Sequence, residues 1–228
     1  MENPHPRRSF LTRLNTGLAS LAATAGVAMA AKKAPEASRW QPARHEKDDW
    51  LDENAAKHRL LFDSINFDGL GEALAFASNI FVTNELDYGM KDHDLAVVVV
   101  LRHRSALFGY NHAMWAKYGE PMAKRAKLED PKTKQAPVLN IYNAAAYGDV
   151  LMSRGITLSG LAAKGVQFAV CNMSTHAFAD VIAKAVGGKG DDIYNELKAN
   201  LIQNARLVPA GIVAVNRAQE RGYTLMSV

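Results

Sequence analysis

The feature that most constrains the fold is an uninterrupted apolar run, Leu95–Leu101 (LAVVVVL). Four consecutive valines favour an extended backbone, because β-branched side chains lose rotamer freedom in a helix. A strand with one face in water would alternate apolar and polar residues, so a continuous run predicts a strand covered on both faces. We therefore expect this segment to lie at the centre of a parallel sheet.

From Arg59 onward, strand-like and helix-like patterns alternate along the chain. Apolar residues recur at helical spacing, and Gly165 and Gly222 stand where two helices would stop. The expected strands are residues 60–62, 95–101, 166–170 and 223–228, and the expected helices are residues 69–87, 111–118, 157–164, 174–185, 192–202 and 209–221. This alternation predicts a three-layer α/β domain, with helices on both faces of a mostly parallel, doubly wound sheet of about four to six strands.

Two segments depart from this alternation. Residues 31–58 are polar and charged and have no sustained apolar period, which predicts an N-terminal arm or linker before the domain of residues 59–228. Residues 119–156 carry Pro and Lys and are poorly periodic, which predicts an insertion loop that could serve as a lid.

Residues 1–30 have the layout of a secretory signal peptide. Arg7-Arg8-Ser9-Phe10-Leu11 resembles the twin-arginine export motif, and an apolar run over residues 14–30 ends in Ala28-Met29-Ala30, a small-residue cleavage site. The alternative is an uncleaved membrane anchor, but the run is diluted by polar residues and is marginal for spanning a bilayer, so we expect no stable membrane insertion after cleavage. The pattern predicts a periplasmic protein exported by the twin-arginine pathway.

The charge of the chain excludes some function classes. Residues 1–30 carry three arginines and one glutamate, so their removal lowers the formal net charge from +4 to +2. The remaining cations are scattered, with one local cluster at Lys124, Arg125 and Lys127 and no interleaved aromatic residues, so we expect no nucleic-acid partner. No GxGxxG follows a strand and no GxxxxGK[ST] occurs, which disfavours a nucleotide-binding dehydrogenase or a P-loop enzyme.

Polar residues follow two of the predicted strands. Arg102, His103 and Arg104 come directly after residues 95–101, and Cys171 and Asn172 come directly after residues 166–170. Ligands collect outside the carboxyl ends of strands in an open parallel sheet. If the two strands are neighbours, the thiol of Cys171 faces a cationic cluster.

Cys171 is the single cysteine, and it precedes a predicted helix whose N-cap is Ser174 or Thr175. Free N–H groups and the positive end of the helix dipole would favour its thiolate, and His176 could serve as its proton partner or lie on the surface. The same placement also fits a buried, inert cysteine.

Two further groups leave alternatives open. Four of the seven histidines are candidate ligands, but they lack the spacing of a metal or haem site; they are His93, His103, His112 and His176. We therefore expect no cofactor and no metal, and a haem or metal binder stays the third alternative. An aromatic and amide group either lines a pocket or packs the insertion onto the sheet; it comprises Tyr110, Trp115, Tyr142, Tyr147, Asn140 and Asn143. The ligand-binding candidates are His103, Asn172, Tyr142 and Asn143.

Residues 165–175 (GVQFAVCNMST) and 207–223 (LVPAGIVAVNRAQERGY) resemble the DsrE/DsrF-like sulfur-relay family. The resemblance implies a three-layer α/β fold with flavodoxin-like topology and a homo-oligomer, often a trimer or hexamer. It also implies a cysteine that takes sulfane sulfur from a donor protein as a persulfide and passes it to an acceptor protein. Only Cys171 carries over to that role. The family's well-understood relays are cytoplasmic and lack the 119–156 insertion.

The leading hypothesis is an exported sulfur-handling protein. Cys171 would carry the persulfide, Arg102 and Arg104 would favour its thiolate, and His176 would help. The competing class is a non-catalytic module that binds a ligand or a partner.

Overall fold

A five-stranded sheet forms the middle layer of the protein, and every pair of neighbouring strands is parallel. The computed structural model describes residues 40–228, so the predicted signal peptide and residues 31–39 lie outside the described residues. The order along the sheet is β4-β3-β2-β1-β5. The strands are β1 (His58–Ser64), β2 (Leu95–Leu101), β3 (Gln167–Cys171), β4 (Ala205–Val208) and β5 (Thr224–Ser227).

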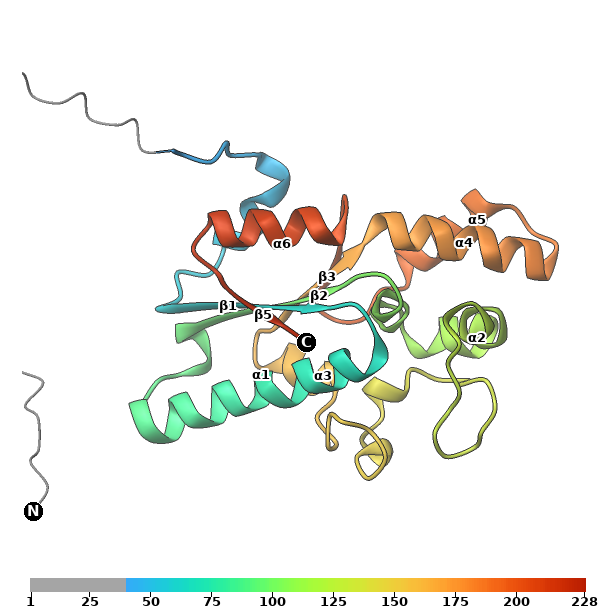
Figure 1. Ribbon diagram of the computed structural model, residues 1–228, viewed down its shortest axis with the longest axis horizontal. Helices are drawn as coiled ribbons and strands as arrows, with labels where there is room; N and C mark the ends of the chain where they lie inside the picture. Colours follow the sequence, from blue (N-terminus) through green and yellow to red (C-terminus); the bar gives the residue numbers. More distant parts are fainter. Residues whose placement is uncertain (1–39) are drawn as a thin grey trace, which may run out of the picture. The chain divides into compact units, whose positions relative to one another are not determined.

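Helices cover both faces of this sheet, which confirms the three-layer α/β fold (Figure 1). α1 and α3 pack on one face, and α6 and the 3₁₀ segment η1 pack on the other. Within residues 40–228, no helix has the length and apolar character required to cross a bilayer. The helical segments are η1 (Glu46–Asp52), α1 (Phe67–Tyr88), η2 (Asp92–Asp94), η3 (Ser105–Gly109), α2 (His112–Ala126), η4 (Ile141–Asn143), η5 (Ala145–Tyr147), α3 (Leu158–Ala163), α4 (Asn172–Val186), α5 (Gly190–Ala199) and α6 (Gly211–Glu220).

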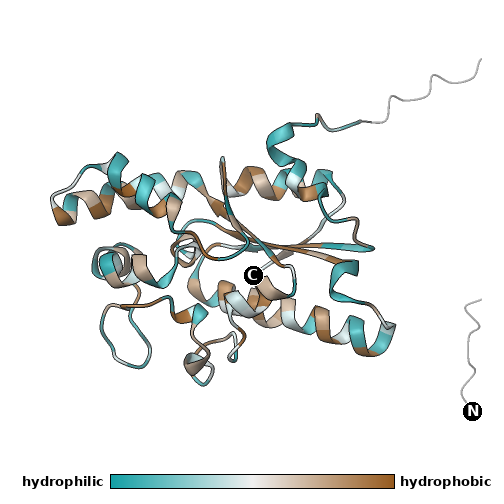
Figure 2. Cartoon of the chain, turned by 180° about the vertical axis from the view of Figure 1, so that it is seen from behind, coloured by the Kyte–Doolittle hydropathy of each residue, from teal (hydrophilic) through white to brown (hydrophobic). Residues whose placement is uncertain are grey.

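The valine run forms β2, which is buried along its whole length between β1 and β3. Val97 and Val99 belong to the apolar core under α1 and α3, whereas Val98 and Val100 belong to the core under α6 and η1. Successive side chains of a strand point to opposite faces, so one strand supplies both cores. Figure 2 shows the same pattern: the strands are mostly brown, and brown and teal alternate along the helices.

The edges of the sheet differ from the sequence-based expectation. β5 lies beside β1, in the place that the second strand takes in the flavodoxin order 2-1-3-4-5. β4, at the opposite edge, is absent from the predicted strands. It reads Ala-Arg-Leu-Val, and its first three residues are only half-buried, so neither an apolar run nor a clean alternation identifies it.

The predicted insertion loop begins later than residue 119, because α2 continues to Ala126 despite an internal proline. Met122 and Ala126 are buried and extend the apolar side of the helix. Gly119 allows a close approach by the returning chain, since a Cβ atom there would lie 2.0 Å from the carbonyl oxygen of Pro137. The first turns of the expected loop are therefore helical and packed.

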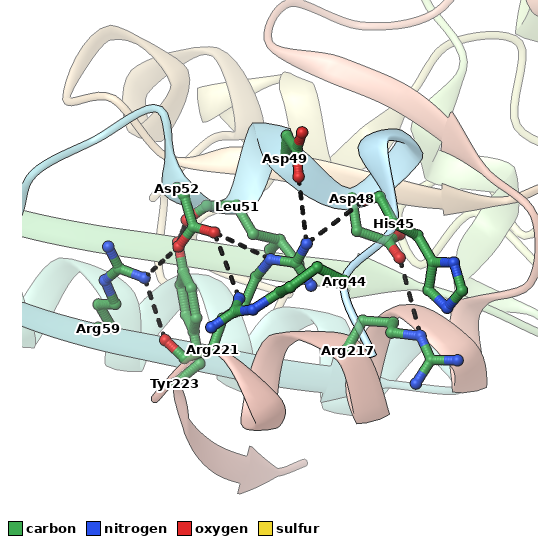
Figure 3. A network of polar contacts seen from close by, with 10 residues as sticks. All are labelled: Arg44, His45, Asp48, Asp49, Leu51, Asp52, Arg59, Arg217, Arg221 and Tyr223. Carbon is green, nitrogen blue, oxygen red and sulfur yellow. Dashed lines mark hydrogen bonds and ion pairs between the residues drawn. The ribbon is translucent and has the colours of Figure 1, made fainter. Parts of the chain in front are cut away.

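Residues 42–58 belong to the same compact unit as the sheet, so this part of the predicted arm is folded onto the domain. η1 is attached through a network of polar contacts (Figure 3). The Arg221 side chain is 1% exposed, and its Nε donates to the Asp52 carboxylate at 3.0 Å. The Tyr223 hydroxyl donates to the carbonyl oxygen of Leu51 at 2.7 Å. Pairing with residues from the end of α6 and from β1 explains why so polar a segment packs against the core.

We expect the Asp52→Asn substitution to destabilise the protein. Burial disfavours the ionised form of Asp52, but hydrogen bonds from Arg59 and Arg221 outweigh burial and hold its pKa below the ordinary value of 3.8. A lowered folded-state pKa contributes stability above the unfolded-state pKa, and this stability is lost as the pH falls through the folded-state pKa. At neutral pH the substitution should lower the free energy of unfolding by about 1–2 kcal/mol, a figure reduced for the partial exposure of Asp52.

Urea unfolding of both proteins measures this difference at neutral pH and again below the folded-state pKa, where it should shrink. Asp87→Asn is the matched control, because Asp87 is exposed near the end of α1. If Asp52→Asn and the unchanged protein were equally stable at neutral pH, the stabilising role of the Asp52 carboxylate would be contradicted.

Candidate functional site

Cys171 is the last residue of β3 and also the residue that caps the first turn of α4. The sequence predicts a later helix start, at Ser174 or Thr175, but α4 begins at Asn172 and continues directly from the strand (Figure 1). The first N–H groups of a helix have no acceptor within it, so the positive end of the α4 dipole lies next to Cys171. Cys171 itself is 6% exposed.

Arg102 is the cation that the sheet brings beside Cys171. β2 and β3 are neighbours, and Leu101 pairs with Val170, so Arg102 and Cys171 follow next on adjacent strands. Alternation places Cys171 on the same face as Ala169, which belongs to the core under α6. The condition set by the sequence, that these two strands be neighbours, is therefore met.

The Arg102 guanidinium is held by Asp63 at the end of β1. Nε of Arg102 donates to one carboxylate oxygen at 2.6 Å and Nη2 donates to the other at 2.8 Å, which makes a bidentate pair. The hydrogen bond to Asp63 is the main cause of the raised pKa of Arg102; burial opposes it, and the nearby Cys171 adds to it. Asp63, Arg102 and Cys171 thus form a row across three strands, in which Asp63 balances the charge of Arg102. The sequence-based prediction missed Asp63.

α6 begins against this row. A Cβ atom at Gly211 would lie 2.5 Å from Cβ of Arg102 and 3.2 Å from Cγ1 of Val100. Only glycine therefore lets the first turn of α6 approach the Arg102 side chain this closely. The close contact holds Arg102 between α6 and Asp63.

A second set of contacts holds the backbone of Cys171 on the other side of the sheet. The Thr175 hydroxyl donates to the Cys171 carbonyl oxygen at 3.0 Å, and the buried Tyr110 hydroxyl donates to Thr175 at 2.8 Å. Burial raises the pKa of Tyr110, so its hydroxyl stays protonated and available as a donor. These bonds fix the strand-to-helix junction that presents the thiol.

His176 and Asn172 contact α5. The His176 ring stacks on the Tyr194 ring, with centroids 3.9 Å apart and an angle of 7° between the planes. The Tyr194 hydroxyl donates to Oδ1 of Asn172 at 2.9 Å. Among the described hydrogen bonds, none joins His176 to Cys171, so His176 has a packing partner other than the thiol.

His103 and Arg104 lie at a separate cavity of about 210 Å³ between the loop after β2, the end of α2 and the first turns of α4. The backbone N–H of His103 donates to the Ser174 hydroxyl at 3.1 Å, which ties the loop to α4. The structure thus divides the expected cationic cluster: Arg102 lies by Cys171, and Arg104 lies at the cavity. The lining residues are His103, Arg104, Arg125, Met173, Ser174, Ala177 and Phe178.

A larger cavity, of about 650 Å³, lies at the amino ends of the strands, between the end of α1 and the starts of β1 and β2. Ligands of open parallel sheets collect at the carboxyl ends of the strands, so we place the candidate site there, around Cys171.

Tyr142 and Asn143 have packing roles at the starts of α1 and α3. The Tyr142 hydroxyl donates to the carbonyl oxygen of Phe67 at 2.6 Å, and its ring meets the Phe108 ring edge-on at 4.8 Å. Oδ1 of Asn143 accepts the N–H of Ser159 at 2.8 Å. These contacts favour the packing alternative for the aromatic group over a pocket lining.

Buried polar contacts anchor the insertion as well. Asn140 donates to the carbonyl oxygens of Phe108 and Tyr110, each at 2.9 Å, and the Tyr147 hydroxyl donates to Asp130 at 2.5 Å. The Asn140 bonds attach the insertion to the loop between β2 and α2, whereas the Tyr147–Asp130 bond lies within the insertion.

The histidines do not assemble into a ligand set in the part of the chain that the structure describes. Within residues 40–228, no three His, Cys, Asp or Glu side chains lie close enough together to hold a metal ion. Nδ1 of His112 instead accepts the N–H of Asn140 at 3.1 Å.

Comparisons with known proteins assign no family. No family profile matches the chain, and no curated protein matches it. One similar solved structure is that of a protein of unknown function from Methanobacterium thermoautotrophicum, with 16% sequence identity and a TM-score of 0.36, covering 75% of this chain and 99% of that one.

We expect Gly211→Ala to lower the free energy of unfolding by about 1–3 kcal/mol, because the added methyl group overlaps the Arg102 side chain and forces it or α6 to move. Gly188→Ala is the matched control: its added Cβ would meet neighbours only at 3.6 Å and beyond, so it should be neutral. Chemical denaturation of the three proteins compares them, and a Gly211→Ala protein as stable as the control would refute the close contact.

Proposed function

We propose that this protein is an exported sulfur carrier in which Cys171 accepts a sulfane sulfur as a persulfide and passes it on. The observation that supports it is the position of Cys171, at the carboxyl end of β3, next to the N-terminus of α4 and beside Arg102. A helix N-terminus and a nearby cation both favour the thiolate, which is the form of cysteine that attacks sulfur. The resemblance of residues 165–175 and 207–223 to the DsrE/DsrF-like sulfur-relay family points the same way.

The proposed step is a thiol–persulfide exchange. The Cys171 thiolate attacks the outer sulfur of a donor persulfide, RS–SH, and a new bond forms between these two sulfur atoms. The bond between the two donor sulfurs breaks, and its electron pair leaves with the donor as the thiolate RS⁻. Cys171 then carries –S–SH, and the same exchange with an acceptor thiolate returns it to its starting state. No external oxidant or reductant is needed.

The roles within this proposal follow the contacts. Arg102 positions its charge beside the sulfur, and Asp63 fixes the orientation of the guanidinium. Cys171 is 6% exposed, so a terminal sulfur atom reaches it more readily than a bulky group does. Arg104 and His176, which were expected to assist, contact the cavity and Tyr194 instead, so the step does not depend on them.

A non-catalytic module that binds a ligand or a partner is the second candidate. The low exposure of Cys171 and the engagement of Arg102 by Asp63 favour it, because a buried thiol beside a neutralised cation behaves as a small apolar side chain. The two candidates differ in one measurable property, which is whether Cys171 gains sulfur.

Mass spectrometry of the intact protein after incubation with a polysulfide donor tests the first candidate. We expect the mass to rise by one sulfur atom, and we expect dithiothreitol to reverse the change. Cys171→Ser should show no added sulfur, whereas His176→Gln should still gain it, because the His176 ring stacks on Tyr194 and forms no described hydrogen bond to Cys171. An unmodified wild-type protein, or an adduct that persists in Cys171→Ser, would leave the non-catalytic module as the better account.

The proposal includes export to the periplasm by the twin-arginine pathway, on the basis of Arg7 and Arg8. It also includes a homo-oligomer, a trimer or hexamer, and separate donor and acceptor proteins, as the family resemblance implies. We expect the double substitution of Arg7 and Arg8 by lysine to retain the uncleaved chain in the cytoplasm, since the receptor recognises the arginine pair and not the charge alone. Fractionation and immunoblotting measure this, with Arg13→Lys as the control, and normal export of the double variant would remove the twin-arginine assignment.

A further inference from the structure

We infer that the cavity between α2, α4 and the loop after β2 binds a small organic oxyanion, with its charged end at Arg104 and Arg125 and its apolar end against Met173 and Phe178. The inference goes beyond the sulfur chemistry of Cys171, which does not line this cavity.

The charge of the cavity points to an anion. Arg104 comes from the loop after β2 and Arg125 from the last turn of α2, so two arginines far apart in the sequence meet at one cavity with no acidic residue in its lining. Within residues 40–228, neither arginine forms an ion pair with a carboxylate. The end of the α2 dipole accounts for a cation at residue 125, but Arg104 is half-buried and has no comparable partner. Guanidinium groups pair in bidentate fashion with carboxylate, sulfonate or phosphate oxygens.

The rest of the lining argues against a bare inorganic ion. The apolar wall on α4 consists of Met173, Ala177 and Phe178. Met173 is a large apolar residue, yet it is 65% exposed. It lies near the carboxyl ends of the strands, where ligands of parallel sheets bind. A ligand with an apolar group would cover this wall and remove it from water. The volume of about 210 Å³ lies below the range of about 300–1,000 Å³ typical of drug-sized ligands, so the ligand is of fragment size.

The His103–Ser174 hydrogen bond makes this a site with fixed walls. It joins the loop that carries Arg104 to the first turn of α4, which carries Met173. The segment that carries Arg104 and the segment that carries Met173 are therefore joined before a ligand arrives, which lowers the entropic cost of binding.

Isothermal titration calorimetry of the whole protein with benzoate, benzenesulfonate and phenyl phosphate tests the inference; benzamide and inorganic sulfate are the comparison ligands. We expect at least one of the three aromatic anions to bind at millimolar concentration or below. Neutral benzamide and sulfate should bind at least about tenfold more weakly, because each lacks one half of the recognised chemistry. Which aromatic anion binds best identifies the oxyanion.

Arg104→Gln and Arg125→Gln should each weaken binding of the best anion by about tenfold or more. Lys184→Gln, at the exposed far end of α4, should bind as the unchanged protein does. Cys171→Ser should also bind normally, so failure of the sulfur proposal and failure of this one are distinguishable. The inference would be overturned if none of the three anions bound, or if both arginine variants bound the best anion as tightly as the unchanged protein does. Binding of benzamide or sulfate as tight as that of the best anion would also overturn it.

Discussion

Burial of β2 on both faces is the constraint on which the rest of the structure depends. A strand between two apolar cores cannot carry a polar side chain along its length without leaving that group unsatisfied. Polar residues therefore appear only after the last residue of β2, at Arg102, His103 and Arg104. These polar residues lie at the carboxyl ends of the strands, where both the Cys171 site and the separate cavity lie.

At the carboxyl ends of the strands, the row of Asp63, Arg102 and Cys171 depends on a partly buried ion pair. Asp63 is 7% exposed, and a carboxylate that is so far from water needs a cation with matching geometry, which the bidentate Arg102 supplies. The same pairing limits the positive potential that reaches the sulfur. The N-terminus of α4 is in direct continuity with Cys171 and places the positive end of a helix dipole there. The proposed sulfur chemistry therefore depends on this backbone dipole as well as on Arg102.

Local patterns were enough to predict the parts of the fold that bury most apolar surface, and contacts between distant segments determined the rest. The valine run and the glycine that ends α6 lie where the sequence predicts. β4 was not predicted because an edge strand needs little apolar character. The extension of α2 was not predicted because Gly119 resembles a loop residue in the sequence, whereas in the structure it permits a close contact with Pro137. For the site, the sequence predicted Arg102 near Cys171 on the condition that the strands before them are neighbours. It did not predict that Asp63 lies beside Arg102 or that Arg125 lies at the same cavity as Arg104. Their positions depend on the register of β1 with β2 and on the packing of α2, which no local pattern encodes.

The attachment of η1 to the end of α6 has a consequence for how the chain folds. Arg221 and Tyr223 bond to Asp52 and to the Leu51 carbonyl group, partners 169 and 172 residues earlier in the chain. Contacts of such large sequence separation close long loops, which slows folding. The amino-terminal segment can therefore take its final place only after the last helix has been synthesised. A ribosome-bound chain would expose Trp50, Leu51 and the uncovered side of the sheet until then, and chaperones could recognise that surface during biosynthesis.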